Sequence, residues 1–342
     1  METKLLDPAT DPTALQQAAD LLRAGQVVGI PTETVYGLGA NAFDEAAVRK
    51  IFAAKGRPQD NPLIVHIADF AQLYDLCPDV PPAAKILANN FWPGPLTMIV
   101  PKNGKIPPET SAGLDTVGVR LPAHPVAREI IRLAGLPVAA PSANLSGRPS
   151  TTTAQHVLRD MDGKIPAVVE GGACTVGVES TVISLAGDVP RLLRPGGVTL
   201  EQLRAVLGEV EVDRALHEQV GEGEKVSAPG MKYRHYAPKA PVTVVLGAPD
   251  KTAAYIRAHA GARTGVLCFD DCAGAFDGLQ VETFGRSDDL KAQAQLVFDR
   301  LRAFDDLDVS DIFAQCPDDR GLGLAVANRI KKAAGFRIVE AG

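Results

Sequence analysis

The stretch Val27-Val-Gly-Ile-Pro-Thr-Glu-Thr-Val-Tyr-Gly-Leu-Gly39 decides the fold class of this chain. Its first four residues are mainly β-branched and predict a short strand over 27–30. Pro31 then begins a loop that is expected to run to Gly39. Helical patterns lie on both sides, over 11–24 and from residue 44 to residue 55. A strand between two helices is typical of an α/β protein.

Both flanking helices carry start and stop signals. Apolar residues recur at helical spacing over 11–24, and Gly25 follows as a stop. Asp44 is a suitable N-cap for the second helix, and Gly56 is a suitable C-terminal stop. The second helix therefore ends at the basic segment that begins with Lys55.

The alternation continues along the chain. Further apolar runs predict strands over 63–67, 96–100, 117–121, 138–140, 168–170 and 181–185. Helices are expected between them near 83–91, 126–134 and 200–207. Together these elements predict a mixed α/β domain of roughly 200 residues with a twisted mixed sheet.

The composition changes after residue 208. Residues 208–224 are acidic and read as a solvated connector, whereas 225–239 carry four cations and no acid. From residue 241, strands at 242–246, 265–269, 279–283 and 309–314 alternate with helices at 252–259, 290–304 and 324–334. This order predicts a smaller Rossmann-like domain with a parallel sheet. We expect domains over 1–205 and 241–342, joined by a linker over 206–240.

Length and charge exclude several classes. The 342 residues carry 35 Lys and Arg against 41 Asp and Glu, a formal net charge of −6, so a fold-wide basic surface for nucleic acid is not expected. No run of about 18 apolar residues occurs, and the N-terminus lacks the pattern of a signal peptide. The five scattered cysteines suit a reducing compartment. We therefore expect a cytoplasmic protein, without structural zinc at its one close pair, Cys268 and Cys272.

The first basic constellation leaves two interpretations open. Lys55, Arg57 and Asn61 follow the helix that Asp44 begins. Cations at a helix C-terminus stabilise the helix dipole. A lysine beside the planar guanidinium of an arginine is also a suitable pair for phosphate oxygens, and Pro58 directs Arg57 away from the helix.

Polar residues follow the strand expected over 138–140. Ser142, Asn144 and Ser150 lie in one segment, either as an ordinary Ser/Asn turn or as the lining of a ligand crevice.

Charged and polar residues also interrupt apolar strands. Arg120 requires either a buried acid or an anionic ligand. His66 in such a strand is more often a hydrogen-bonded core residue than a catalytic one, and Ser180 is compatible with an ordinary strand position. Arg194 precedes a Pro-Gly-Gly turn.

Familiar nucleotide and hydrolase motifs are missing. The sequence has no P-loop, no Gly-x-Ser-x-Gly elbow and no His-Glu-x-x-His. Gly37-Leu-Gly39-Ala-Asn-Ala42 matches a loose dinucleotide fingerprint, but it begins several residues beyond its strand. A dehydrogenase is therefore not expected.

Several motifs together resemble those of the YrdC-like threonylcarbamoyl-AMP synthases. They are Pro31-Thr-Glu-Thr-Val-Tyr-Gly-Leu38, Lys55-Gly-Arg-Pro58, Asn61-Pro-Leu-Ile-Val-His66, Pro141-Ser-Ala-Asn144, Gly177-Val-Glu-Ser-Thr-Val182 and Leu193-Arg-Pro-Gly-Gly197. The linker Ser227-Ala-Pro-Gly-Met-Lys-Tyr-Arg-His-Tyr-Ala-Pro238 and the segment Gly321–Arg329 are similar to the two-domain form of that family. The resemblance spans nearly the whole chain and is weaker over 241–315.

The resemblance implies a nucleotidyltransferase. L-threonine, bicarbonate (or CO2) and ATP would give threonylcarbamoyl-AMP and pyrophosphate. Partner transferase proteins would use the product to modify the tRNA adenosine next to the anticodon, with weak or no direct tRNA binding by this chain. Mg2+ would accompany ATP, held mainly by phosphates and water, with no metal ligands from the protein.

The resemblance also assigns residues. Lys55 and Arg57 would act as the catalytic cations on the triphosphate. The ATP side would comprise Lys55, Arg57, Asn61, Thr116, Ser142, Asn144, Ser150, Arg194, His235 and Tyr236. The L-threonine side would comprise Thr34, His66, Arg120, Ala140 and Ser180. The linker, with His235 and Tyr236, would close over the nucleotide as a lid. The alternative function is a non-catalytic RNA-binding or translation-linked module, which the net charge of −6 disfavours.

Overall fold

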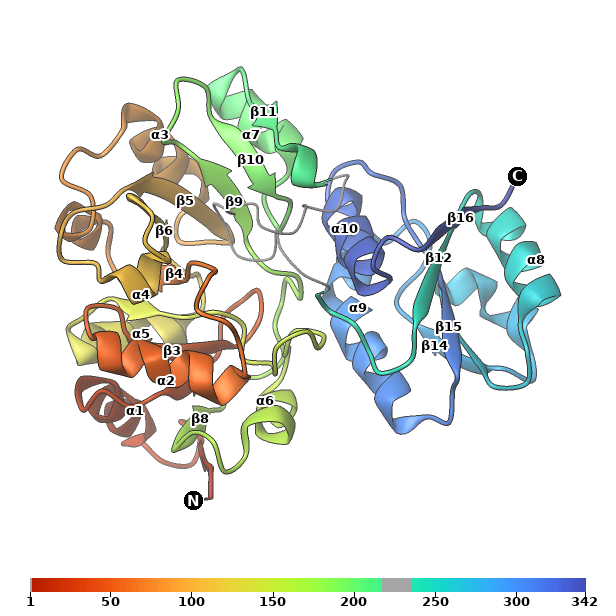
Figure 1. The fold of residues 1–342 in the computed structure, drawn as a ribbon, viewed down its shortest axis with the longest axis horizontal. Coiled ribbons are helices and arrows are strands. Elements are labelled where there is room, and N and C mark those ends of the chain that lie inside the picture. The colour runs from red at the N-terminus through yellow and green to blue at the C-terminus, as the bar shows by residue number, and fades with distance from the viewer. Residues whose placement is uncertain (1, 217–234) are drawn as a thin grey trace.

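The computed structural model of the chain describes residues 2–216 and 235–342. The N-terminal part is built on a mixed β-sheet, and the C-terminal part is built on a separate parallel sheet. In Figure 1 the two parts lie side by side. The predicted fold class, a mixed sheet followed by a smaller parallel α/β unit, is confirmed.

The larger sheet has eleven strands among the described residues. Their spatial order is β1 (Lys4–Leu6), β8 (Ala167–Val169), β2 (Val28–Ile30), β3 (Gly37–Asn41), β7 (Val138–Ala139), β4 (Ile64–His66), β6 (Thr116–Arg120), β5 (Leu96–Pro101), β9 (Thr181–Ser184), β10 (Arg191–Arg194) and β11 (Glu211–Val212). The sheet contains both parallel pairs, such as β4 and β6, and antiparallel pairs, such as β2 and β3. The apolar runs predicted the middle of this sheet to within one or two residues.

Strand β3 was not predicted. The sequence indicated a loop as far as Gly39, but Gly37–Asn41 pairs antiparallel with β2 and with β7. Leu38 and Ala40 are buried between these neighbours, so tertiary pairing overrides the low strand propensity of glycine. This segment is therefore a strand and not the strand-to-helix turn of a dinucleotide fingerprint.

Helices cover the larger sheet and position parts of its loops. They are α1 (Ala14–Arg23), α2 (Glu45–Lys55), α3 (Pro82–Phe91), α4 (Pro108–Ser111), α5 (Pro125–Ala134), α6 (Ala154–Met161) and α7 (Leu200–Leu207), with 3-10 helices at Phe70–Asp75 and Arg214–Leu216. The Asp44 side chain accepts hydrogen bonds from two N–H groups of α2, and Gly56 ends this helix with a φ of 61°, as predicted. No helix within 2–216 and 235–342 is long and apolar enough to cross a bilayer.

The smaller sheet is wholly parallel. Its order is β14 (Gln280–Thr283), β13 (Thr264–Cys268), β15 (Asp311–Gln315), β12 (Val242–Leu246) and β16 (Ile338–Glu340). Helix α8 (Pro249–His259) and 3-10 helix η3 (Asp270–Phe276) lie on one face. Helices α9 (Leu290–Ala303) and α10 (Gly323–Ala333) lie on the other face, toward the N-terminal part, and 3-10 helix η4 (Phe304–Asp306) follows α9 (Figure 1).

The two parts share one apolar cluster. Val35 and Val178 of the N-terminal part, with Tyr236, pack into the core that α9 and α10 form with the smaller sheet. Beside them Gly177 leaves no space for a side chain, because a Cβ atom there would lie 2.3 Å from the Cα atom of Gln295 in α9. The close approach of the two parts therefore depends on this glycine.

Gly177→Ala should destabilise the packing between the two parts. Gly177 has a φ of 81°. Gly172 has a φ of 77°, but a Cβ atom there would meet nothing within 4 Å beyond the adjacent residues, so Gly172→Ala is the matched control for backbone strain. We expect Gly177→Ala to lower the free energy of unfolding by about 1–3 kcal/mol more than Gly172→Ala, because only the first adds overlap. Thermal unfolding followed by circular dichroism measures this difference. Equal midpoints for the two variants would contradict the packing described above.

Candidate active site

A pocket lies against the middle strands of the larger sheet and collects residues from distant segments. Loops after β2, β7 and α2 line it together with the ends of β4, β6 and β10. Eleven of the side chains predicted from the sequence face it: Thr34, Arg57, His66, Arg120, Ala140, Ser142, Asn144, Ser180, Arg194, His235 and Tyr236. The pocket thus unites residues from both the predicted ATP side and the predicted threonine side.

Four predicted residues do not line the pocket. Lys55, Asn61 and Ser150 are buried in or behind its wall. Thr116 begins β6, four residues before Arg120, so the strand rise places it about 13 Å away along the strand. The structure therefore gathers most of the predicted set here and leaves Thr116 outside.

Arg120 is the centre of one end of the pocket. Its side chain is buried at the end of β6, and its Nη1 donates a 2.8 Å hydrogen bond to Thr34 Oγ1. Its Nε donates to the carbonyl of Gly94 at 3.2 Å. An ion pair of 2.7 Å joins its Nη2 to Glu33 Oε1. These contacts therefore hold the guanidinium group rigidly, with its N–H groups at the pocket wall.

Glu33 is the buried acid that pairs with Arg120, where the sequence left open either a buried acid or an anionic ligand. Burial by itself would raise its pKa, yet the charge and hydrogen bonding of Arg120 hold the pKa below its ordinary value. Glu33 lies in the Pro31-Thr-Glu-Thr34 motif. The need of Arg120 for a buried counter-charge is the feature of the sequence that could have pointed to it. Glu33 and Arg120 thus form a buried ion pair beside the pocket.

Ser180 and Arg194 form a further part of the pocket wall. Arg194 Nε donates to the Ser180 carbonyl at 3.0 Å, and its Nη2 donates to Ser180 Oγ at 3.1 Å. Thr97 Oγ1 lies 2.8 Å from the same hydroxyl. Burial lowers the pKa of Arg194. The turn after Arg194 packs closely against β9. A Cβ atom on Gly196 would stand 2.2 Å from the Thr181 nitrogen, so there is no space for a side chain at this position.

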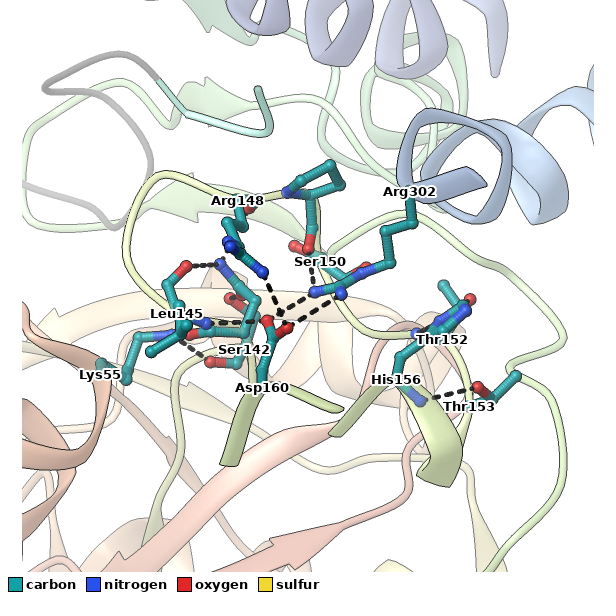
Figure 2. Close-up of polar contacts among 12 residues, drawn as sticks. Lys55, Ser142, Leu145, Arg148, Ser150, Thr152, Thr153, His156, Asp160 and Arg302 are labelled. Atoms are coloured by element: carbon teal, nitrogen blue, oxygen red, sulfur yellow. Dashed lines mark hydrogen bonds and ion pairs between the residues drawn. The ribbon is translucent and has the colours of Figure 1, made fainter. Parts of the chain in front are cut away.

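Lys55 supports the loop after β7. Its Nζ donates to the carbonyls of Ser142 and Asn144, the second at 2.6 Å (Figure 2). Ser142 Oγ in turn donates to Asn144 Oδ1 at 2.5 Å. Burial, and then the charge of Arg57, lower the pKa of Lys55 well below its ordinary value. In this structure Lys55 contacts the loop, while Arg57 is the member of the Lys-x-Arg pair that lines the pocket.

The pocket is chemically suited to anions. Arg57, Arg120 and Arg194 line it, and planar guanidinium groups bind carboxylate and phosphate oxygens. Burial lowers the pKa of Arg57 to about 10, which still leaves it charged near neutral pH. Among the residues that the structure describes, no three His, Cys, Asp or Glu side chains gather into a metal cluster.

Glu179 was not predicted as a site residue, although it lies in the quoted Gly-Val-Glu-Ser-Thr-Val motif. It lines the pocket and accepts a hydrogen bond from the hydroxyl of Ser150. Its other carboxylate oxygen lies 2.6 Å from Nε of Arg329 in α10. A helix of the C-terminal part therefore reaches the wall of this pocket.

Comparisons with known proteins cover both parts of the chain. The Sua5/YciO/YrdC family model, described as "Telomere recombination", matches residues 20–196. The model described as "Threonylcarbamoyl-AMP synthase, C-terminal domain" matches residues 198–335.

Individual relatives match along the full length. A threonylcarbamoyl-AMP synthase of Bacillus subtilis is 51% identical over 335 residues, covering 97% of this chain and 96% of the relative. One of Pyrococcus abyssi is 48% identical, covering 94% of each chain. The crystal structure of P. abyssi Sua5 complexed with L-threonine superposes with a TM-score of 0.93 at 45% identity, covering 100% of both chains.

His66 should contribute a pH-dependent stability. Burial, and then the charge of Arg120, lower its pKa from 6.5 to about 3. Between these values the unfolded chain binds a proton at this residue that the folded chain does not, so stability is lost as the pH falls from about 6.5 to about 3. We expect His66→Gln to weaken the dependence of the melting temperature on pH between about 7 and about 4.

His259→Gln is the matched control for this measurement, because that ring is exposed on α8. It should leave the wild-type pH dependence unchanged. A wild-type and a His66→Gln profile that fall in parallel would show that His66 is protonated in the folded chain.

Proposed function

Because the chain belongs to the Sua5/YciO/YrdC family and carries the C-terminal domain of threonylcarbamoyl-AMP synthases, we propose that it makes threonylcarbamoyl-AMP from L-threonine, bicarbonate or CO2, and ATP. Pyrophosphate is the second product, so the enzyme is a nucleotidyltransferase. One observation carries the proposal for this chain. Three arginines from three separate segments converge on a single pocket that also presents Thr34 and Ser180.

The Arg120 end of the pocket suits L-threonine, the ligand of the P. abyssi Sua5 structure. Arg120 has further N–H groups beside those that face Thr34, Gly94 and Glu33, so it would receive the substrate carboxylate as a bidentate pair. The hydroxyls of Thr34 and Ser180, with His66 and Ala140, would bind the remaining polar and apolar atoms of threonine. Bicarbonate or CO2 would meet the amine in this space.

The opposite end of the pocket suits ATP. Arg57 and Arg194 would contact phosphate oxygens, and Ser142 and Asn144 would hydrogen-bond the nucleotide. The remaining predicted members of the ATP side are Lys55, Asn61, Thr116, Ser150, His235 and Tyr236. Lys55 would act by holding the carbonyls of the 142–144 loop as well as by its charge.

The chemistry needs no protein nucleophile. The neutral amine of threonine attacks the carbon of bicarbonate, and water leaves to give a carbamate. A carbamate oxygen then attacks the α-phosphorus of ATP while the bond to the β-phosphate oxygen breaks, which gives threonylcarbamoyl-AMP and pyrophosphate. The protein therefore acts by holding several anions in reacting positions and by stabilising the charge on the phosphates.

An ATP-using synthase of this kind works with a divalent metal, and we assign Mg2+. The described residues gather no three-ligand metal cluster, and Glu33 and Glu179 are each paired with an arginine. This donor set fits an ion that phosphate oxygens and water hold and that arrives with the nucleotide. Mg2+ supplies charge neutralisation on the triphosphate when it is bound.

The remaining assignments concern the context of the reaction. The product would pass to threonylcarbamoyl transferase proteins that modify the tRNA adenosine next to the anticodon, in the cytoplasm. The linker predicted over 206–240 would cover the nucleotide as a lid. Residues 217–234 lie outside the described part of the chain, whereas His235 and Tyr236 line the pocket.

The proposed activity is tested by pyrophosphate release from ATP. We expect release that requires L-threonine, bicarbonate and Mg2+ together, because the carbamate is the only nucleophile for the α-phosphorus. A coupled colorimetric assay measures it, and mass spectrometry identifies the adenylate. Equal release without threonine would contradict the proposal. A non-catalytic RNA-binding module predicts instead no release, and tRNA binding that weakens steeply with salt.

The two ends of the pocket are tested by two arginine variants. Arg120→Met should raise KM for threonine by about tenfold or more and change KM for ATP less, because it removes the bidentate carboxylate partner. Arg57→Met should show the reverse selectivity. Arg49→Met is the control, because Arg49 is an exposed arginine on α2 that pairs with Glu45 and Glu109. If each variant raised the KM for threonine and the KM for ATP equally, this would contradict the assignment of one end of the pocket to threonine and the other to ATP.

A further inference from the structure

Two arginines of the C-terminal part are buried against the N-terminal part. Arg302 lies near the end of α9 with 5% of its surface exposed, and Arg329 lies on α10 with 0% exposed. A buried guanidinium is strongly destabilising unless acids and carbonyls satisfy it. The partners of both arginines lie in or behind the pocket wall.

Arg329 binds the glutamate that faces the pocket. Its Nε lies 2.6 Å from Glu179 Oε2, and its Nη2 donates to the carbonyl of Pro195 at 2.9 Å. Its guanidinium carbon stands 5.6 Å from the ring centroid of Tyr236, another lining residue. Arg329 therefore contacts three segments of the wall at once.

Arg302 binds the segment that carries Ser150. Its Nη2 donates to Asp160 Oδ2 at 2.8 Å and to the carbonyl of Pro149 at 2.6 Å, while its Nε donates to the carbonyl of Ser150 at 3.2 Å (Figure 2). Asp160 also accepts a 3.0 Å hydrogen bond from the N–H of Leu145. One arginine and one aspartate thus hold both ends of the 145–150 segment.

The two arginines converge on Ser150. Its carbonyl accepts from Arg302, and its hydroxyl donates to Glu179, which Arg329 holds. The backbone and the side chain of one predicted ATP-side residue are therefore both fixed from the C-terminal part.

The negative charge of Glu179 would repel an anion in the pocket, and Arg329 balances this charge. An unpaired carboxylate in the wall would repel a triphosphate, and repulsion between like charges is strong in a partly desolvated site. Burial would raise the pKa of Glu179, but the charges of Arg329 and Arg194 hold it below its ordinary value, so the carboxylate is ionised. Arg329 supplies the neighbouring positive charge that balances it.

In the C-terminal part, the Gln315 side chain lies at the ends of the central strands. Gln315 at the end of β15 accepts from the N–H of Phe269 at 3.0 Å and donates to Thr252 Oγ1 at 2.7 Å. Its Nε2 also donates to the carbonyl of Pro249 at 3.0 Å. This amide occupies the position where parallel α/β sheets ordinarily bind ligands.

We propose that the C-terminal part acts in the reaction through Arg329 and Arg302, as positioning residues of the ATP side of the pocket. Arg329 neutralises Glu179 and orients it on Ser150, and Arg302 fixes the backbone of the 145–150 segment. The inference rests on the proposed function, because it takes the Ser150 side of the pocket as the side that binds ATP.

The test is a double-mutant cycle on Arg329 and Glu179, measured as KM for ATP and KM for threonine. Arg329→Met keeps most of the apolar stem of the side chain and removes the charged guanidinium group. We expect it to raise KM for ATP by about tenfold or more, with a smaller change for threonine, because an unpaired carboxylate then faces the phosphates. Adding Glu179→Gln should restore most of the loss in ATP KM, because the repelling charge is gone.

Arg302→Met should likewise raise KM for ATP more than KM for threonine. Arg159→Met is the matched control. Arg159 and Asp306 also join the two parts of the chain, at 2.7 Å, but both side chains are exposed, so their loss should leave both KM values unchanged. Thermal unfolding of every variant identifies any that does not fold. The Arg329→Met/Glu179→Gln variant removes both members of this ion pair together, so neither is left without the other.

The outcomes separate the two proposals. A wild-type chain without threonine-dependent pyrophosphate release overturns the proposed function itself. With wild-type activity present, a folded Arg329→Met variant with unchanged KM for ATP overturns the positioning role. A double variant that is as impaired in ATP KM as Arg329→Met overturns the electrostatic argument and leaves Arg329 a packing residue only.

Discussion

Three buried guanidinium groups each meet a buried acid, and these pairs organise both parts of the molecule. Arg120 meets Glu33, Arg329 meets Glu179 and Arg302 meets Asp160. Removing one partner of such a pair leaves an uncompensated charge in a medium of low polarity, which destabilises a protein by about 3–5 kcal/mol. The pocket wall and the junction between the two parts therefore both depend on these ion pairs.

The same pairs prepare the pocket for anions. Its wall contains two glutamate-bearing motifs, and each glutamate would repel a carboxylate or a phosphate if it stood alone. Pairing with arginine cancels that repulsion while leaving oxygen atoms to orient neighbours, as Glu179 does for Ser150. A protein with a net charge of −6 thereby presents a local surface on which arginines determine the field.

The arginines of the C-terminal part pair with acids of the N-terminal part, so the same kind of ion pair joins the two parts. The apolar face of α9 and α10 packs against Val35, Val178 and Tyr236. The two buried arginines of these helices bind acids of the N-terminal part. Apolar packing and two buried ion pairs thus both join the two parts. The lining of the pocket is consequently a property of the whole chain, although most of the lining residues belong to the N-terminal part.

The sequence by itself determined the alternation of strands and helices, the ends of α2 at Asp44 and Gly56, and the group of polar residues that the pocket unites. These features depend on local periodicity, on capping and on short motifs, so neighbouring residues suffice to encode them. Only the tertiary structure decided that Gly37–Asn41 is a strand, that Lys55 contacts a loop and that Thr116 lies away from the pocket. It also decided the pairing of Glu179 with Arg329, residues 150 positions apart. Such a pair depends on which helix faces which strand, and that is set by packing of the two cores rather than by any pattern within either segment.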